Sequence, residues 1–133
     1  MDQATLVREQ IDEGVEIVKD LEKASFPVSD VYWQFASEEE RWHLCFVVPD
    51  LDQKGIRASY KRVHTALNGR PTRPFGVDPF DIRLVDLTDP VAKAIHAFQD
   101  KHGDTLPTTV RGTLLEGQYI ERAFIYPRSM KLK

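Results

Sequence analysis

The stretch from Asp30 to Val48, DVYWQFASEEERWHLCFVV, decides the fold, because apolar residues alternate with others on both sides of an acidic run. Such alternation places successive side chains on opposite faces of a β-strand. Two strands are predicted, near residues 31–35 and 42–48, and the polar SEEE run predicts the turn between them. One face of this hairpin is expected to pack in the core. It carries Val31, Trp33, Phe35, Trp42, Leu44, Phe46 and Val48.

The opposite face of the predicted hairpin mixes polar and apolar residues. Antiparallel sheets often bury one face and leave the other in water. One hypothesis is therefore a small-ligand or enzymatic pocket on this wet face. Its candidate lining residues are Tyr32, Gln34, Arg41, His43 and Cys45.

His43 and Cys45 share this face two residues apart, as an imidazole base and a thiol nucleophile would need to do. Free cysteine is also one of the residue types most often buried, and a histidine in a hairpin commonly has a structural role. We favour the structural interpretation and predict no catalytic residue.

A helix is predicted before the hairpin, over residues 3–25, where apolar or small residues recur at spacings of three and four. The same heptad pattern occurs in dimeric coiled coils, but a helix packed on a sheet needs it too, and Gly14 weakens the coiled-coil interpretation. Ser25 and Pro27 are expected to end the helix. The stripe consists of Ala4, Val7, Ile11, Gly14, Val18 and Leu21.

A second helix is predicted near residues 53–68, with Asp50 or Asp52 as its cap and Asn68-Gly69 at its end. Its expected core stripe is Ile56, Tyr60, Val63 and Leu67.

The remaining chain predicts a strand over 80–87, a helix that begins at Pro90 behind a capping Asp89, and a hairpin over 108–126 that turns at Glu116-Gly117. Residues 126–133 are expected to be a flexible tail. The order α-β-β-α-β-α-β-β predicts an α+β fold. We expect a two-layer sandwich, with an antiparallel or mixed sheet of about five strands and helices mainly on one face.

Composition predicts one soluble domain spanning residues 1–133, of which 41% are hydrophobic. A single cysteine cannot form an internal disulfide, and no apolar run approaches the ~18 residues of a membrane span. We therefore expect a cytoplasmic protein with no membrane partner. The net charge of −3 gives no general reason to expect nucleic acid as a partner.

Charge is distributed unevenly along the chain. Residues 1–40 hold 11 acidic and 3 basic residues, whereas residues 41–73 hold 7 basic and 2 acidic ones. The acidic first helix is therefore expected to neutralise the basic region within one chain or to meet its copy in a dimer. The basic region could be a solvated helix flank, contact an acidic protein or bind phosphate groups. Its candidate residues are Lys54, Arg57, Lys61, His64, Arg70 and Arg73, with Arg62 beside them.

The sequence contains no dinucleotide-binding or phosphate-binding glycine loop, and neither the HExxH nor the GxSxG motif. We predict no cofactor and no metal, since Cys45 stands alone and His96 and His102 do not share a helix face. The run Pro49-Asp50-Leu51-Asp52-Gln53-Lys54 contains both halves of a nuclease signature, but adjacent acids before a helix are better explained as caps.

The stretch from Phe26 to Leu67 resembles a group of small uncharacterised bacterial proteins with no assigned activity. The resemblance covers about a third of the chain. It implies a bacterial cytosolic origin and no particular chemistry. The residues that carry it are Phe26-Pro27-Val28, Trp33, the acidic turn before Arg41-Trp42, Val47-Val48-Pro49, Asp52, Gly55, Tyr60 and Val63.

The sequence favours a non-enzymatic interaction or accessory domain, which would be a homodimer or bind another protein. Exposed sheet edges would be available for strand addition from a partner. The alternatives are a ligand pocket on the wet face of the first hairpin and, third, weak nucleic-acid binding through the basic second helix.

Overall fold

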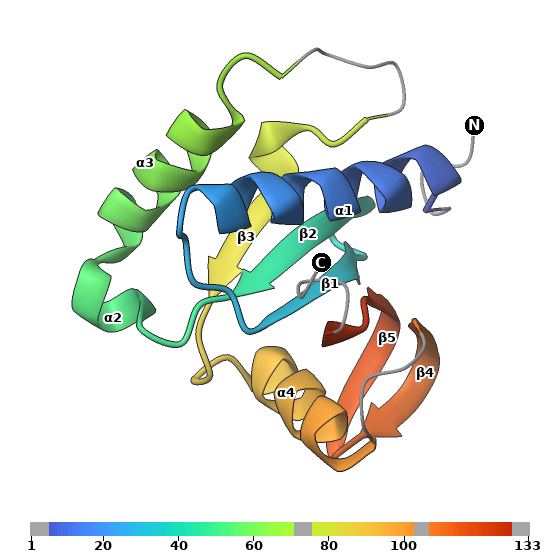
Figure 1. The fold of residues 1–133 in the computed structure, drawn as a ribbon. Coiled ribbons are helices and arrows are strands. Elements are labelled where there is room, and N and C mark those ends of the chain that lie inside the picture. Colours follow the sequence, from blue (N-terminus) through green and yellow to red (C-terminus); the bar gives the residue numbers. More distant parts are fainter. Residues whose placement is uncertain (1–5, 71–75, 103–106, 129–133) are drawn as a thin grey trace.

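The predicted hairpin lies in the middle of a five-stranded mixed sheet, which confirms the α+β class (Figure 1). This computed structural model describes residues 6–70, 76–102 and 107–128. The strand order is β3-β2-β1-β5-β4; β2 and β3 run parallel, and the other neighbours are antiparallel. The strands are β1 (Asp30–Ala36), β2 (Arg41–Val47), β3 (Ile82–Val85), β4 (Thr108–Leu115) and β5 (Gln118–Ile125).

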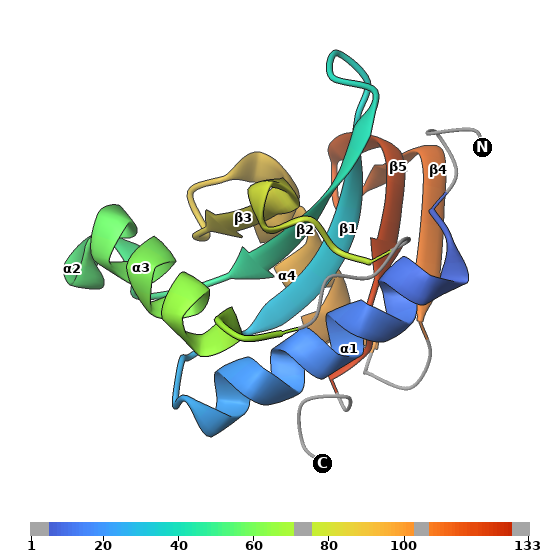
Figure 2. The same cartoon turned by 90° about the horizontal axis from the view of Figure 1, so that it is seen from above.

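The helices follow the predicted order, but they flank both faces of the sheet and form three layers instead of two. Two of the longer helices, α1 and α3, pack beside each other on one face, and α4 lies on the opposite face (Figures 1 and 2). A single 3-10 turn precedes β3. These elements are α1 (Arg8–Lys23), α2 (Leu51–Lys54), α3 (Ile56–Leu67), η1 (Pro79–Asp81) and α4 (Pro90–His102).

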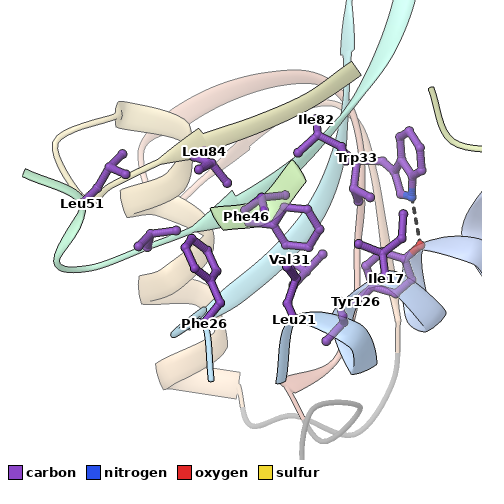
Figure 3. Packing of buried hydrophobic residues seen from close by; sticks show 14 of the residues in the cluster. Ile17, Leu21, Phe26, Val31, Trp33, Phe46, Leu51, Ile82, Leu84 and Tyr126 are labelled. Atoms are coloured by element: carbon purple, nitrogen blue, oxygen red, sulfur yellow. Dashed lines mark hydrogen bonds between the residues drawn. The ribbon is translucent and has the colours of Figure 1, made fainter. Parts of the chain in front are cut away.

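The apolar face of the hairpin forms the larger core, as predicted. Val31, Trp33, Leu44 and Phe46 are almost completely buried beneath α1 and α3. Figure 3 shows Val31 and Phe46 near Leu21 of α1, with Ile82 and Leu84 of β3 in the same cluster. The alternation in the sequence therefore identified the face that excludes water.

The second face of the hairpin is covered as well, so the expected wet face is wrong. Tyr32, Cys45 and Val47 pack in a second apolar cluster with Ala92 and Ile95 of α4. The sequence pattern could not show this cover, because α4 is supplied by a segment about 45 residues further along the chain. Because α4 packs on this face, the face forms a second core.

The predicted second helix is broken at Gly55, which has a φ of +86°. Glycine reaches this backbone conformation without the steric cost that a side chain imposes. The break changes the helical phase, so that Leu51 of α2 enters the core, while Ile56 at the start of α3 is 56% exposed. Ile56 therefore does not belong to the core stripe, whereas Val63 is buried and Tyr60 and Leu67 pack partly buried against the same core, as predicted.

The hydroxyl group of Tyr126 joins three distant parts of the fold. It accepts a hydrogen bond from Trp33 Nε1 at 2.9 Å and donates one to the carbonyl oxygen of Ile11 in α1 at 2.6 Å. Figure 3 shows the bond to Trp33. Gly14 leaves the space that this hydroxyl occupies, because a Cβ at that position would overlap with the Tyr126 hydroxyl oxygen.

The expected flexible tail does not begin at residue 126. Tyr126 is only 3% exposed, and Arg128 binds the carboxylate of Asp30. Residues 129–133 lie outside the described residues. The chain therefore remains part of the packed structure for three residues beyond β5.

The space at Gly14 predicts strong coupling between this glycine and Tyr126. Gly14→Ala should lower the free energy of unfolding by about 2 kcal/mol, because Tyr126 is held by two hydrogen bonds and cannot move aside. Tyr126→Phe should cost about 2 kcal/mol through the unpaired Trp33 and Ile11 groups. In the double variant the ring Cζ, 3.0 Å from the position of the alanine Cβ, replaces the hydroxyl oxygen as the nearest atom, so the overlap is smaller and the combined loss should fall short of the sum by about 1 kcal/mol or more.

Urea unfolding of the four proteins measures this cycle. Alanine normally favours a helix interior over glycine by about 1 kcal/mol. A Gly14→Ala protein that is more stable than the original would therefore show that the close approach is absent.

Candidate functional site

The predicted pocket residues Tyr32 and Cys45 face each other across β1 and β2 and are sealed beneath α4. Burial raises the pKa of Cys45 to about 12, and burial likewise raises the pKa of Tyr32. The nucleophile in thiol chemistry is the thiolate, which this environment disfavours. The Cys45 thiol instead points at the carbonyl oxygen of His43, 3.8 Å from Sγ. These two residues are core residues.

The other three pocket candidates occupy the far end of the same hairpin. Gln34 is half-buried opposite His43. The imidazole of His43 lies between two carboxylates, with Nε2 at 3.0 Å from Glu39 and Nδ1 at 3.7 Å from Asp81. Arg41 reaches Asp81 at 2.8 Å. Arg41 and Asp81 are therefore paired with each other at the join between the hairpin and η1, while the buried His43 Nδ1 has no hydrogen-bond partner within the described structure.

The basic patch predicted on the second helix is exposed. Lys54, Arg57, Lys61 and His64 all lie at the surface of α2 and α3. None of the three long cations forms an ion pair with any residue in the described ranges. Arg73 falls outside the described residues. Arg57, Lys61 and His64 follow spacings of four and three and so share one face of α3, whereas Lys54 lies in α2 on the other side of the break at Gly55.

Arg70 does not belong to this patch, because it forms ion pairs with acidic residues of α1. Its guanidinium lies 2.5 Å from Asp20, 3.3 Å from Glu16 and 3.6 Å from the buried Glu13. Glu13 also accepts a hydrogen bond from the backbone N–H of Val77. The acidic helix is therefore partly neutralised within one chain, which was one of the two outcomes expected from the charge pattern.

Two shallow hollows lie on either side of the loop that joins α1 to β1. Arg62 separates them, because it donates to the carbonyl oxygen of Ser25 and stacks over the ring of Phe26 at 5.0 Å. We call them the α3 hollow, of about 480 Å³, and the Phe26 hollow, of about 430 Å³. The α3 hollow is lined by Ala24, Ala58, Lys61, Arg62, Thr65 and Ala66, and the Phe26 hollow by Val18, Leu21, Glu22, Ser25, Phe26, Pro27 and Val28.

A buried ion cluster between β1, α4 and the end of the described chain was missed by sequence reasoning. Asp30, whose side chain is completely buried, binds Arg128 Nε at 2.8 Å and His96 Nδ1 at 2.7 Å. Arg128 also reaches Asp100 at 2.7 Å. These residues come from segments up to 98 positions apart, so no local spacing could have revealed them.

Burial alone would raise the pKa of Asp30, but hydrogen bonds from Arg128 and His96 outweigh burial and lower it. The cluster resembles an acid–histidine pair used in catalysis, yet the His96 ring that Asp30 orients has Asp100 beside its other nitrogen, at 3.6 Å. Neither hollow includes these residues. We assign the cluster to anchoring the chain beyond β5.

The acids of the nuclease-like run have no shared ligand position. Asp50 precedes α2 without a side-chain capping bond, so the expected cap there is wrong, whereas Asp89 does cap α4 through the N–H of Ala92. Across residues 6–70, 76–102 and 107–128, no three His, Cys, Asp or Glu side chains are placed to hold a metal ion.

Comparisons with protein-family models, with curated proteins and with solved structures found no match for this chain. No helix within the described parts of the chain has the length and apolar character needed to cross a membrane.

The exposed basic residues of α2 and α3, together with the two hollows beside them, form the candidate site of this structure.

The Asp30 cluster predicts a specific loss of stability in acid. Because the pKa of Asp30 is lowered in the folded state, its stabilising effect is present above the carboxyl's ordinary value of 3.8 and is lost as the pH falls through the folded value. Arg128→Ala should cost about 2 kcal/mol at pH 7, since it leaves a buried carboxylate with one fewer partner. The variant should also lose less stability than the original protein between pH 5 and pH 3.

Unfolding by urea at several pH values measures both effects. Arg8→Ala is the matched control, because its partner Asp12 is exposed and such surface pairs contribute about 0.5 kcal/mol or less. Equal acid dependence in the original and Arg128→Ala proteins would contradict the assigned role of Asp30.

Proposed function

We propose that this protein is a non-enzymatic interaction domain that binds an acidic, amphipathic segment of a partner protein along α3. The observation that carries this proposal is the set of unpaired cations beside an apolar hollow on one helix. Lys61 belongs to both features, because it lines the α3 hollow and has no anionic partner among the described residues.

The contrast between cations that are paired with acidic residues and cations that are not supports an acidic partner. Arg70 forms ion pairs with acidic residues of α1, and Arg41 forms ion pairs with Asp78 and Asp81. Lys54, Arg57 and Lys61 are left without such partners in the described structure. A surface of one sign attracts ligands of the opposite sign and raises the rate at which they meet it.

The apolar part of the same surface favours a protein over a nucleic acid. Three of the six residues that line the α3 hollow are the alanines Ala24, Ala58 and Ala66, and Ile56, on the same helix, is 56% exposed. Small side chains on a helix allow close approach of another helix, and an amphipathic helix in a groove buries its apolar face there. Nucleic-acid backbones are bound mainly by cations and need no such apolar floor.

Charge reversal on α3 tests the proposal. Arg57→Glu with Lys61→Glu should weaken binding of a Leu- and Glu-rich amphipathic helical peptide by about tenfold at low salt, as two favourable charge interactions become repulsive. Ala58→Arg should also weaken it, although this change adds a positive charge, because the arginine fills the hollow. Fluorescence anisotropy with the labelled peptide gives both values.

Lys93→Glu is the matched control, since it reverses an exposed charge on α4 and should leave binding unchanged. Duplex DNA of random sequence is the competing probe. Tighter binding of DNA than of the peptide, strengthened by Ala58→Arg, would replace this proposal with nucleic-acid binding. Absence of peptide binding at low salt would refute it.

A second copy of this chain is the second candidate partner, through the edge strand β4. The other edge of the sheet is occupied, because the Leu84 N–H of β3 donates to the Tyr60 hydroxyl at 2.9 Å. Among the described residues, none bonds to the outer edge of β4. Leu114 and Tyr119 form an exposed cross-strand pair beside it. An open antiparallel edge is complementary to itself under twofold symmetry.

Sedimentation tests the homodimer directly. Leu114→Lys should weaken self-association by about tenfold or more, because it removes apolar burial and places two charges at the junction. Ile56→Lys, the matched change at an exposed residue of α3, should not. A protein that stays monomeric at high concentration, or that responds to Ile56→Lys instead, would remove this candidate.

We favour the interaction domain over the ligand-pocket alternative, because α4 covers Tyr32 and Cys45, and because Arg41 and His43 lie against carboxylates. We further propose that the protein acts in the cytoplasm of a bacterium. The single cysteine supports a reducing compartment, since it is free and buried.

A further inference from the structure

We propose that the Phe26 hollow is a binding site for a small amphipathic cation, an apolar group that carries a protonated amine. This site is separate from the α3 surface and does not depend on the function proposed for it. The residues that line it belong to the C-terminal half of α1 and to the segment that leads from α1 to β1, whose course can be followed in Figure 2.

The hollow offers an apolar floor for the body of such a ligand. Val18, Leu21 and Phe26 line it and are themselves at most 5% exposed, so the floor is part of the packed core and is held in place. Its volume of about 430 Å³ lies in the range of small-ligand sites. The apolar body of a ligand would rest on this preformed surface.

Glu22 supplies the polar group. It lies one helical turn beyond Val18 and lines the same hollow. Its Oε1 atom is buried and has no hydrogen-bond partner within the described structure. A buried carboxylate oxygen without a donor costs free energy, and a protonated amine would supply both a donor and the opposite charge.

The Arg62 cation, which lies over the Phe26 ring, does not fulfil this role. It donates to the Ser25 carbonyl oxygen, and among the described residues no ion pair joins it to Glu22. The geometry therefore combines a fixed apolar floor with one unsatisfied acceptor, which favours a cationic ligand over a neutral or anionic one of the same shape.

Phenethylamine and 3-phenylpropionate are suitable probes, because both carry a phenyl ring on a short chain and they differ in the sign of the charge. Methyl NMR spectra should show saturable shifts of Val18, Leu21 and Val28 with phenethylamine only. Glu22→Gln keeps the shape of the side chain and should reduce that affinity by about tenfold or more. Glu9→Gln, an exposed change on the same helix, is the matched control and should leave it unchanged.

A dipeptide, N-acetyl-Phe-Lys-amide, separates a free amine from a protein side chain as the source of the cation. Tighter binding of the dipeptide supports a lysine of a partner, and tighter binding of phenethylamine supports a free amine; both support a cation site. The proposal is overturned if phenethylamine gives no saturable shift, if the carboxylate binds equally well, or if Glu22→Gln binds the amine as tightly as the original protein.

Discussion

The buried hydroxyl group of Tyr126 is the contact on which the arrangement of the layers depends. It bonds at once to Trp33 in the central strand β1 and to the backbone of α1, and it does so from the end of the chain that follows β5. Gly14 permits this approach because it has no side chain. Both bonds lie in a dry region, where an unpaired partner is costly, so they fix the distance and the angle at which α1 crosses the sheet.

The position of α1 in turn determines how charge is distributed over the surface. Once α1 lies beside α3, its buried Glu13 and the neighbouring acids meet Arg70 within the same chain. The cations Lys54, Arg57 and Lys61 of α2 and α3 stay exposed and have no such partner among the described residues. The loop from α1 to β1 then forms the ridge between the two hollows, with Arg62 lying across it. The positions of the proposed binding surfaces thus depend on how α1 packs beside α3.

The fold buries two kinds of polar group: those with hydrogen-bond partners and those without. Asp30 is fully buried and fully engaged, by Arg128 and by His96, and it ties the chain beyond β5 to β1 and α4. The Oε1 atom of Glu22 and the hydroxyl of Tyr32 are buried without a hydrogen-bond partner in the described structure. Tyr32 lies in a packed core, where nothing can reach it, whereas Glu22 borders a hollow. Of these two unsatisfied groups, only Glu22 therefore lies beside a space that a ligand could occupy.

The sequence by itself determined the strands, their apolar face and the order of the elements, because these depend on local alternation, on turn residues and on helix signals such as Asp89-Pro90. It also located the acidic and basic segments, since charge is additive along a chain. It placed Ile56 in the core, because a continuous helix was assumed through Gly55. Only the tertiary structure decided that α4 closes the second face, that Arg70 joins α1 and that Asp30 meets Arg128. These contacts link residues tens of positions apart, and no local pattern encodes a distance in space.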